Sequence, residues 1–309
     1  MSKYIIGVDG GGTKTLGVLY NLEGREIKRY VSGFSNFNID YDQATKNLFD
    51  VLDHLTIDLK HTDELWIQLG ISGYSKIREK ESFEDALGEK YHAKVNLESD
   101  VLIALYDVKK SLNVNVIMVI GGTGSVVMYS DQQRLEQIGG FGHLLGDEGS
   151  AYHLSITALK DVIDVYEDKG SYDDFGKLIL DHLNVKHHFG IRDFVYANEK
   201  TKVADISTFI NELALSNNEK AIKMIEDEAK SLARQTVRAY LKMSSSEHLI
   251  IALRGGFLTK SNLMKKTFLE QINMSIKDYE LNESDESPVK GAYYLSLLKL
   301  KKGWFYDRY

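Results

Sequence analysis

Near its start the chain places a carboxylate beside a run of glycines and hydroxyl or amino side chains. Asp9 is followed by Gly10, Gly11, Gly12, Thr13 and Lys14. A glycine turn leaves backbone N–H groups uncovered by Cβ atoms, so these groups can surround phosphate oxygens. A carboxylate at the rim suits a bound cation. The run therefore predicts a phosphate-binding turn with Asp9 next to a metal ion.

The elements on either side of this turn read as strands. Apolar residues 4–6 precede it, and the segment 16–20 after it alternates and is rich in strand formers. Two familiar nucleotide motifs instead open a helix with their glycines. In the P-loop, Lys directly follows the second glycine, whereas Thr13 follows Gly12 here. A hairpin is therefore favoured over a helix.

The same arrangement recurs in the middle of the chain. Residues 116–120 and 126–129 are strand-like and flank the run Gly121, Gly122, Thr123, Gly124 and Ser125. Thr13 aligns with Thr123 once one glycine is dropped, and Asp9 then aligns with Ile120. An internal duplication is predicted, because two matching turns in two halves rarely arise by chance. The second copy has no carboxylate and would offer N–H groups and hydroxyls.

A third motif, residues 139–151, is the densest in the chain. It contains five glycines together with His143, Asp147, Glu148 and Ser150. Asp147 and Glu148 are expected at or in the first turn of the following helix, where capping alone could explain an acidic pair. Capping does not need five glycines, however. Close approach of the backbone to a ligand is the favoured explanation.

The remaining pattern is mixed α/β. Strands are expected at 26–31, 66–71, 94–97 and 249–253, and helices at 41–55, 81–88, 100–108 and from Pro288 to about residue 300, with a largely helical stretch over 151–242. A chain of 309 residues exceeds the usual size of one core. We expect one domain over residues 1–112 and a second over 113–309, with the option that the final helix, 288–302, packs back on the first.

Composition narrows the classes of protein. The net charge of −7 argues against a nucleic-acid surface, and the apolar run at the start is too short for a signal peptide or a membrane span. A cytoplasmic protein with no membrane partner is the expectation. Cysteine is absent, which excludes disulfides, thiolate catalysis, iron–sulfur ligation and cysteine zinc sites.

Together these motifs, with Gly255-Gly256 and Pro288-x-x-Gly291, resemble the N-acetylglucosamine kinase and BadF/BadG/BcrA/BcrD ATPase family of the actin, sugar-kinase and Hsp70 superfamily. The resemblance implies duplicated actin-like ATPase (ribonuclease H-like) domains, each a five-stranded mixed sheet with flanking helices. It also implies MgATP and a small-molecule amino sugar bound in a cleft, and a homodimer.

The resemblance also implies roles for particular residues. Asp100, which opens a helix after a short strand, matches the catalytic aspartate, although a helix N-cap is the alternative for an Asp there. Asp9 would hold Mg²⁺ through water. The nucleotide would meet Gly10, Gly11, Gly12, Thr13, Lys14, Gly122, Thr123, Gly255 and Gly256. The sugar would meet Asn36, Phe37, Asp100, Ser125, Gly142, His143 and Asp147. Phe141 stands where the family usually has tryptophan, which bears on the sugar fit.

Phosphoryl transfer needs positioning, a cation and a carboxylate that accepts the proton of the attacking hydroxyl. Together with these requirements, the resemblance implies an ATP-dependent kinase that phosphorylates N-acetylglucosamine on its 6-hydroxyl as the expected function. Glucosamine is an alternative substrate, as is N-acetylmuramic acid, whose lactyl group needs room near Asn36 and Phe37. An ATPase of the iron–sulfur activator branch is disfavoured by the missing cysteines. A nucleotide-binding sensor is disfavoured because Asp9 and Asp100 are both present.

Overall fold

The computed structural model describes residues 2–111, 113–244, 247–284 and 287–301. The chain divides into two compact units, residues 1–112 with 286–309 and residues 113–285. The sequence assigned 113–309 to the second domain with the option that the last helix returns, and the structure groups this helix with the first unit. Residue 302, its expected end, lies outside the described residues.

The first unit is built on a five-stranded mixed sheet in the order β3-β2-β1-β4-β5. β1, β2 and β3 are antiparallel neighbours, whereas β4 and β5 run parallel to β1. Its strands are β1 Lys3–Gly10, β2 Thr15–Asn21, β3 Glu26–Ser32, β4 Glu64–Ile71 and β5 Ala93–Ser99. Its helices are α1 Tyr41–Thr56, the 3₁₀ turn η1 Tyr74–Lys76, α2 Lys80–Tyr91, α3 Asp100–Lys109 and α12 Val289–Lys301.

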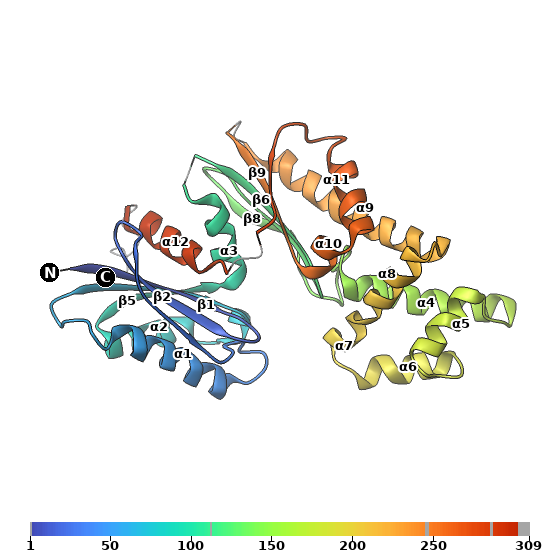
Figure 1. Ribbon diagram of the computed structural model, residues 1–309, viewed down its shortest axis with the longest axis horizontal. Helices are drawn as coiled ribbons and strands as arrows, with labels where there is room; N and C mark the ends of the chain where they lie inside the picture. The colour runs from blue at the N-terminus through green and yellow to red at the C-terminus, as the bar shows by residue number, and fades with distance from the viewer. Residues whose placement is uncertain (1, 112, 245–246, 285–286, 302–309) are drawn as a thin grey trace. The chain divides into compact units, whose positions relative to one another are not determined.

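Helices cover both faces of this sheet, α1 and α2 on one side and α3 and α12 on the other (Figure 1). The side chains of strand β1 alternate between the two faces of the sheet, which explains why helices cover both faces. Ile6 packs in the cluster that contains α1 and α2 residues, whereas Ile5 packs with Val289 and Tyr293 of α12. The C-terminal helix is thus part of the core beneath the first glycine turn.

The second unit repeats the same sheet, in the order β10-β9-β6-β7-β8. β6, β7 and β8 are antiparallel neighbours, and β9 and β10 run parallel to β6. Its strands are β6 Asn115–Gly121, β7 Ser125–Ser130, β8 Leu135–Gly139, β9 Leu249–Arg254 and β10 Glu280–Asn282. The matching strand order confirms the predicted duplication.

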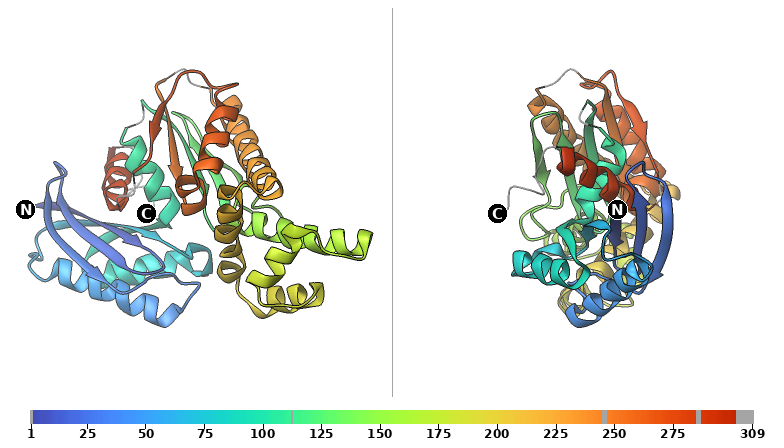
Figure 2. Two further views of the ribbon diagram at one scale, coloured as in Figure 1. Left: turned by 45° about the vertical axis from the view of Figure 1, so that its right-hand side comes forward. Right: turned by 90° about the vertical axis from the view of Figure 1, so that its left-hand side faces the viewer.

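Eight helices lie among the described residues of the second unit. They are α4 Ala151–Lys169, α5 Asp174–His182, α6 His188–Ala197, α7 Lys200–Ala204, α8 Ile206–Leu215, α9 Glu219–Lys242, α10 Gly256–Lys260 and α11 Asn262–Ile272. The long helix α9 packs against β6, β7 and β8, and α11 lies beside it (Figure 2). One apolar cluster includes residues of all these layers.

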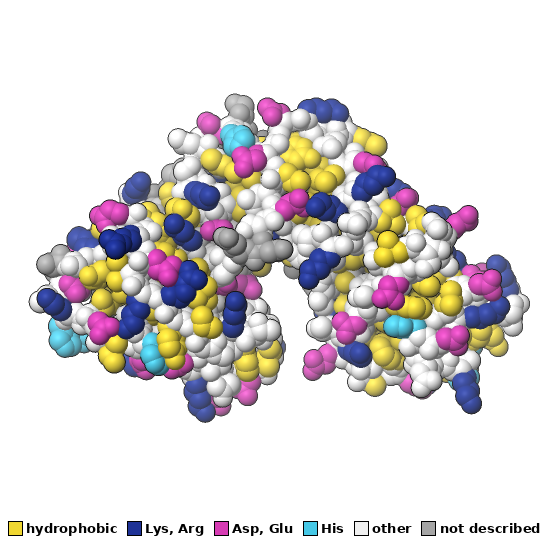
Figure 3. Space-filling view, viewed as in Figure 1, with side chains coloured by type: hydrophobic (Ala, Val, Ile, Leu, Met, Phe, Trp, Pro, Cys, Tyr) yellow, Lys and Arg dark blue, Asp and Glu magenta, His cyan; other side chains and the backbone are white. Residues whose placement is uncertain are grey.

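The predicted strands and helices are all present with small changes at their ends. The short strand β10 and the helices α10 and α11 were not predicted. On the face shown in Figure 3, basic and acidic side chains are interspersed over each unit. No helix within the described residues is both long and apolar enough to cross a bilayer.

Candidate functional site

The first glycine turn joins β1 to β2 in the predicted hairpin, with Gly10 opposite Thr15. The Gly11 N–H donates to the Lys14 carbonyl at 3.0 Å and closes the turn. The side chains of Thr13 and Lys14 are exposed. Because β2 follows directly, a phosphate here would meet backbone N–H groups and these side chains rather than the end of a helix.

The second glycine turn joins β6 to β7, with Gly121 opposite Ser125. It is one residue shorter than the first turn, as predicted, and Ile120 occupies the position that corresponds to Asp9. The Gly122 carbonyl accepts a hydrogen bond from the Ala151 N–H at 2.9 Å. The turn is therefore fixed to the first residue of α4.

Gly255, between β9 and α10, lies directly against this second turn. Its φ is +88°, and a Cβ there would lie 2.6 Å from the Gly121 carbonyl carbon and 2.7 Å from the Gly122 nitrogen. Packing and conformation both require glycine at this position. The predicted nucleotide residues of the second unit thus form one continuous backbone surface.

Other glycines of the two turns have no such structural reason. Gly11, Gly12, Gly122 and Gly256 have no positive φ, and a Cβ on any of them would meet no described atom closer than 3.5 Å. At Gly256 no atom lies within 4 Å at all. The space beside these backbones is open, as expected where a ligand approaches main-chain N–H groups.

Two half-buried carboxylates lie near the first turn. Asp9 is at the end of β1, and its Oδ2 accepts a hydrogen bond from the Ser287 hydroxyl at 2.6 Å. Burial is the main cause that raises the pKa of Asp9 above 3.8; Ser287 opposes the shift, and the negative charge of Asp100 adds to it. Asp9 and Asp100 are thus close enough to interact. Ser287 was not among the predicted site residues.

Asp100 is the first residue of α3, but it is not the helix cap. Ser99 is the N-cap, since its hydroxyl accepts from the Leu102 N–H at 3.2 Å. Asp100 Oδ1 accepts from the Val101 N–H at 2.9 Å, and Ser72 also hydrogen-bonds the carboxylate. Burial is the main cause that raises the pKa of Asp100, and these hydrogen bonds oppose it. The capping explanation for Asp100 is therefore wrong.

Backbone hydrogen bonds tie the first turn to two neighbouring loops. The Gly11 carbonyl accepts from the Ser35 N–H at 3.0 Å, and the Gly10 carbonyl accepts from the Ser72 N–H at 2.8 Å. The Ser72 carbonyl in turn accepts from the Phe37 N–H at 3.1 Å. Asn36 lies between Gly12 and Gly73, with its Oδ1 accepting from the Asn38 N–H at 2.9 Å. Asn36 and Asp100 are thus brought to the same loop cluster.

Phe37 differs from the expectation of a sugar contact. Its ring is 4 % exposed and packs edge-on against Tyr41 and Phe83. The aromatic ring therefore belongs mainly to the core. It also forms part of the wall of a pocket that extends toward η1 and α2.

In the second unit, the loop before α4 contains the other predicted sugar residues. Gly142 has φ +84° with no atom near its Cβ position, and His143 is exposed and packs edge-on against Tyr152. Asp147 is 4 % exposed, and its Oδ2 forms an ion pair with Lys200 of α7 at 2.6 Å. Lys200 was not predicted, because it lies far from Asp147 in sequence.

One expectation about this loop needs correction. Asp147 and Glu148 do not lie in the first turn of α4, because the helix is capped by Ser150, whose hydroxyl accepts from the His153 N–H at 3.1 Å. Asp147 instead has φ +69°, which no helix residue adopts. Ser125 is buried, and its hydroxyl donates to the Glu148 carbonyl at 2.8 Å. In this structure Ser125 holds the loop.

The residues present also fit a magnesium ion shared with a nucleotide. Magnesium is usually held by one or two carboxylates, with water and substrate phosphates filling its other positions. No described residues form a group of three or more His, Cys, Asp or Glu suited to a metal. Asp9 offers a single carboxylate at the rim of the glycine turn. Ser287 donates a hydrogen bond to its Oδ2, and Oδ1 is the oxygen that could face a metal ion.

Comparison with known proteins agrees with this geometry. A profile of the BadF/BadG/BcrA/BcrD ATPase family matches residues 6–293, which span both units. The chain belongs to the BadF/BadG/BcrA/BcrD ATPase family. The matched range contains both glycine turns and the loop before α4.

Two curated relatives align with this chain over nearly their whole length. An N-acetylmuramic acid/N-acetylglucosamine kinase from Clostridium acetobutylicum is 26% identical, with 94% of this chain and 97% of that protein covered. An N-acetyl-D-glucosamine kinase from Dictyostelium discoideum is 25% identical, with 96% and 99% covered.

Among solved structures, a Chromobacterium violaceum protein assigned as an N-acetylglucosamine kinase has a TM-score of 0.68 at 20% identity, covering 95% of this chain and 98% of that one. This likeness concerns the fold. The two matching five-stranded sheets give this BadF/BadG/BcrA/BcrD family member the actin-like ATPase fold.

Proposed function

We propose that this protein is an ATP-dependent amino-sugar kinase that transfers the γ-phosphate of MgATP to the 6-hydroxyl of N-acetylglucosamine. The observation that supports it best is Asp100, a half-buried carboxylate with a raised pKa in the same loop cluster as the first glycine turn. Full-length relatives with the names of amino-sugar kinases support the substrate class.

Asp100 acts as the general base in this proposal. A carboxylate with a raised pKa takes up a proton more readily than an ordinary carboxylate. Hydrogen bonds from Val101 and Ser72 fix the direction in which the carboxylate points. A sugar hydroxyl bound against Asp100 would lose its proton as its oxygen attacks the phosphorus.

The two glycine turns bind the nucleotide. Gly10, Gly11, Gly12, Thr13 and Lys14 would meet phosphates in the first unit, and Gly122, Thr123, Gly255 and Gly256 would meet the nucleotide in the second. The open Cβ positions at Gly11, Gly12, Gly122 and Gly256 support this assignment. Asp9 would hold Mg²⁺, which supplies neutralisation of phosphate charge.

The sugar-binding residues come from the loops of each unit. Asn36 and the backbone of Phe37 would bind sugar in the first unit. Gly142, His143 and Asp147 would bind it in the second, with Ser125 supporting their loop. We also propose a homodimer, which light scattering coupled to size-exclusion chromatography would measure directly.

A coupled ADP-release assay with a panel of amino sugars tests the proposal. We expect release that depends on N-acetylglucosamine and on Mg²⁺, with the product identified as the 6-phosphate by NMR. ADP release without any sugar would instead indicate an ATPase. Nucleotide binding without release under any condition would indicate a sensor, and either result would refute the kinase.

A second candidate substrate is N-acetylmuramic acid, and one pocket favours it. A pocket of about 740 Å³ lies beside Phe37 and is lined also by Asn38, Tyr41, Lys76, Arg78, Glu79, Ser82, Phe83 and Ala86. Lys76 and Arg78 are exposed, and neither forms an ion pair with another described residue. Because the pocket is lined by two cationic side chains, Lys76 and Arg78, and by one carboxylate, Glu79, it would attract the lactyl carboxylate of this sugar.

Arg78→Ala separates the two substrates. If the lactyl group binds in this pocket, the variant should raise the KM for N-acetylmuramic acid about fivefold, as expected for an exposed ion pair, and leave the KM for N-acetylglucosamine unchanged. Lys46→Ala, an exposed cation of α1 outside the pocket, is the matched control. Equal effects of Arg78→Ala on both sugars would argue against this pocket.

A further inference from the structure

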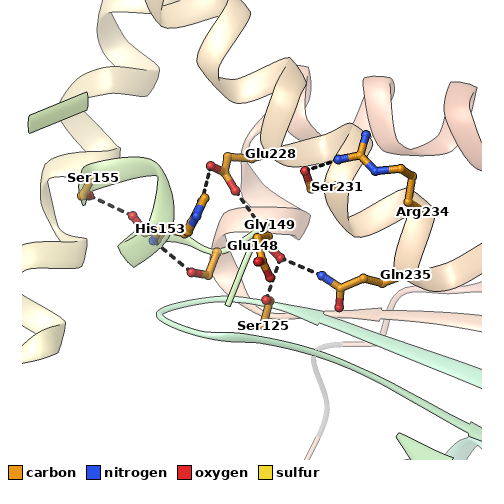
Figure 4. A network of polar contacts seen from close by, with 11 residues as sticks. Ser125, Glu148, Gly149, His153, Ser155, Glu228, Ser231, Arg234 and Gln235 are labelled. Atoms are coloured by element: carbon orange, nitrogen blue, oxygen red, sulfur yellow. Dashed lines mark hydrogen bonds and ion pairs between the residues drawn. The ribbon is translucent and has the colours of Figure 1, made fainter. Parts of the chain in front are cut away.

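Three consecutive residues of the loop before α4 are each held by another element. Asp147 pairs with Lys200, and the Glu148 carbonyl accepts from Ser125 of β7 at 2.8 Å and from Gln235 of α9 at 3.2 Å. The Gly149 N–H donates to Glu228 of α9 (Figure 4). Helix α9 therefore fixes the backbone immediately after the proposed sugar ligand.

Glu228 is the centre of this arrangement. It is 5 % exposed, and its Oε2 accepts from the Gly149 N–H at 2.6 Å while its Oε1 lies 2.7 Å from His153 Nδ1. A buried carboxylate is tolerated only when its oxygens have such partners. Gly149 has φ +89°, and a Cβ there would lie 2.6 Å from the Leu232 Cβ. The loop backbone at Gly149 is thus in close contact with α9, and a side chain at this position would not fit.

The neighbour of Glu228 in this network, His153, is a titratable side chain. Its hydrogen bond to Glu228 is the main cause that raises the pKa of His153 above 6.5; burial opposes the shift, Glu148 adds to it and Lys160 opposes it. When His153 is protonated, its bond to Glu228 is charge-assisted and stronger. When His153 is neutral, this charge assistance is lost and the contact weakens.

We propose that Glu228 and His153 are positioning residues for the sugar site. This proposal rests on the proposed role of Asp147 in sugar binding. The hydrogen bond between Glu228 and His153 holds Gly149 and so orients the Asp147 carboxylate, most firmly when His153 is protonated. Asp147 is only two residues away and has φ +69°. Its carboxylate direction therefore depends on both the Lys200 pair and the anchored backbone at Gly149.

Glu228→Gln is the decisive variant, because the amide oxygen can still accept from Gly149 but cannot form an ion pair with His153. We expect the KM for the amino sugar to rise about tenfold and the KM for ATP to stay within about twofold, with kcat little changed. Glu226→Gln is the matched control, since Glu226 is on the same helix and pairs only weakly with Lys230 at 3.4 Å. It should leave both KM values unchanged.

The pH profile distinguishes positioning from simple structural support. For the wild type, the sugar KM should rise as the pH increases through the raised pKa of His153, because His153 then loses its proton. In Glu228→Gln and in His153→Gln this rise should be much smaller. A wild-type profile that the two variants reproduce would overturn the role of the His153 charge.

Hydrogen exchange of the Gly149 amide tests the anchor without any substrate. Exchange should be faster in Glu228→Gln than in Glu226→Gln, and in the wild type it should be faster at high pH than base-catalysed exchange alone explains. Unchanged exchange, or equal rises in both KM values, would overturn the proposal. A wild type without kinase activity would refute the proposed function, whereas the exchange result would still report on the anchor.

Discussion

The Asp100 carboxylate, the proposed general base, is held in place by neighbouring residues. Ser99 caps α3, so the Asp100 carboxylate is left to accept from Val101 and Ser72. We expect Asp100→Asn to lower kcat about 100-fold or more, with a modest change in sugar KM, because an amide cannot accept the hydroxyl proton. Steady-state kinetics measures both. Asp85→Asn, an exposed carboxylate of α2, is the control, and near-normal turnover in Asp100→Asn would place the base elsewhere.

Asp9 should make the free protein less stable at neutral pH. Its folded-state pKa lies above the unfolded value of 3.8, chiefly through burial. As pH rises past 3.8, the unfolded chain releases this proton first, so folding stability falls until pH passes the folded pKa. Asp9→Asn should therefore raise Tm by about 2 °C or more at pH 7, a gain that shrinks toward acid pH. Calorimetry without nucleotide measures this.

Asp131 provides a control, because its pKa shift, and so the expected change in Tm, has the opposite sign to that of Asp9. Burial raises its pKa, but hydrogen bonds from Ser244, Gln133 and Arg134 together outweigh burial and lower it below 3.8. Asp131→Asn should thus lower Tm at neutral pH, and the loss should disappear as pH falls through the folded pKa. A Tm for Asp9→Asn below that of the wild type at every pH would contradict the sign derived for Asp9.

At the scale of elements, the turn between β9 and α10 provides a pair of adjacent glycines with different roles. Gly255→Ala should lower Tm, because its Cβ would collide with Gly121 and its φ is +88°. Gly256→Ala should leave Tm within about 1 °C but raise the KM for ATP about tenfold, because its Cβ would occupy only the open space where we propose that the nucleotide binds. Thermal denaturation and kinetics measure the two effects.

Gly255→Ala and Gly256→Ala are controls for each other. Both substitutions add the same methyl group to neighbouring residues. An unchanged ATP KM in Gly256→Ala would remove the support that the open glycines give to nucleotide binding. Equal losses of Tm would show that both glycines are structural.

At the scale of the whole molecule, helix α12 completes the first unit although it lies far along the chain from that unit's other elements. Gly291 of α12 lies against α3, where a Cβ would lie 1.8 Å from the Ile103 carbonyl oxygen and 2.6 Å from the Asp107 nitrogen. Gly291→Ala should destabilise the protein by about 3 kcal/mol, because backbone cannot yield as a side chain can. Chemical denaturation measures the loss, and the exposed neighbour Lys290→Ala should show none.

Much of the architecture follows from local sequence. The turn from Gly10 to Thr15 and its copy from Gly121 to Ser125 were predicted with their one-residue difference, because glycine-rich turns between alternating apolar strands have few other conformations. Strand β10 was missed, since three residues carry little periodic signal. The start of α4 at residue 151 was predicted, but Asp147 and Glu148 were wrongly placed at its first turn, because Asp147 and Ser150 are both common capping residues.

The sequence by itself determined that two glycine hairpins, each within a mixed α/β sheet, and one glycine-rich acidic loop would occur in this chain, because turn chemistry and apolar alternation act between near neighbours. Only the tertiary structure decided which side chains meet them. Ser287 reaches Asp9 from 278 residues away, and Glu228 reaches Gly149 from 79 residues away. Such partners are selected by how helices pack on a sheet, and no local pattern in the sequence encodes that choice.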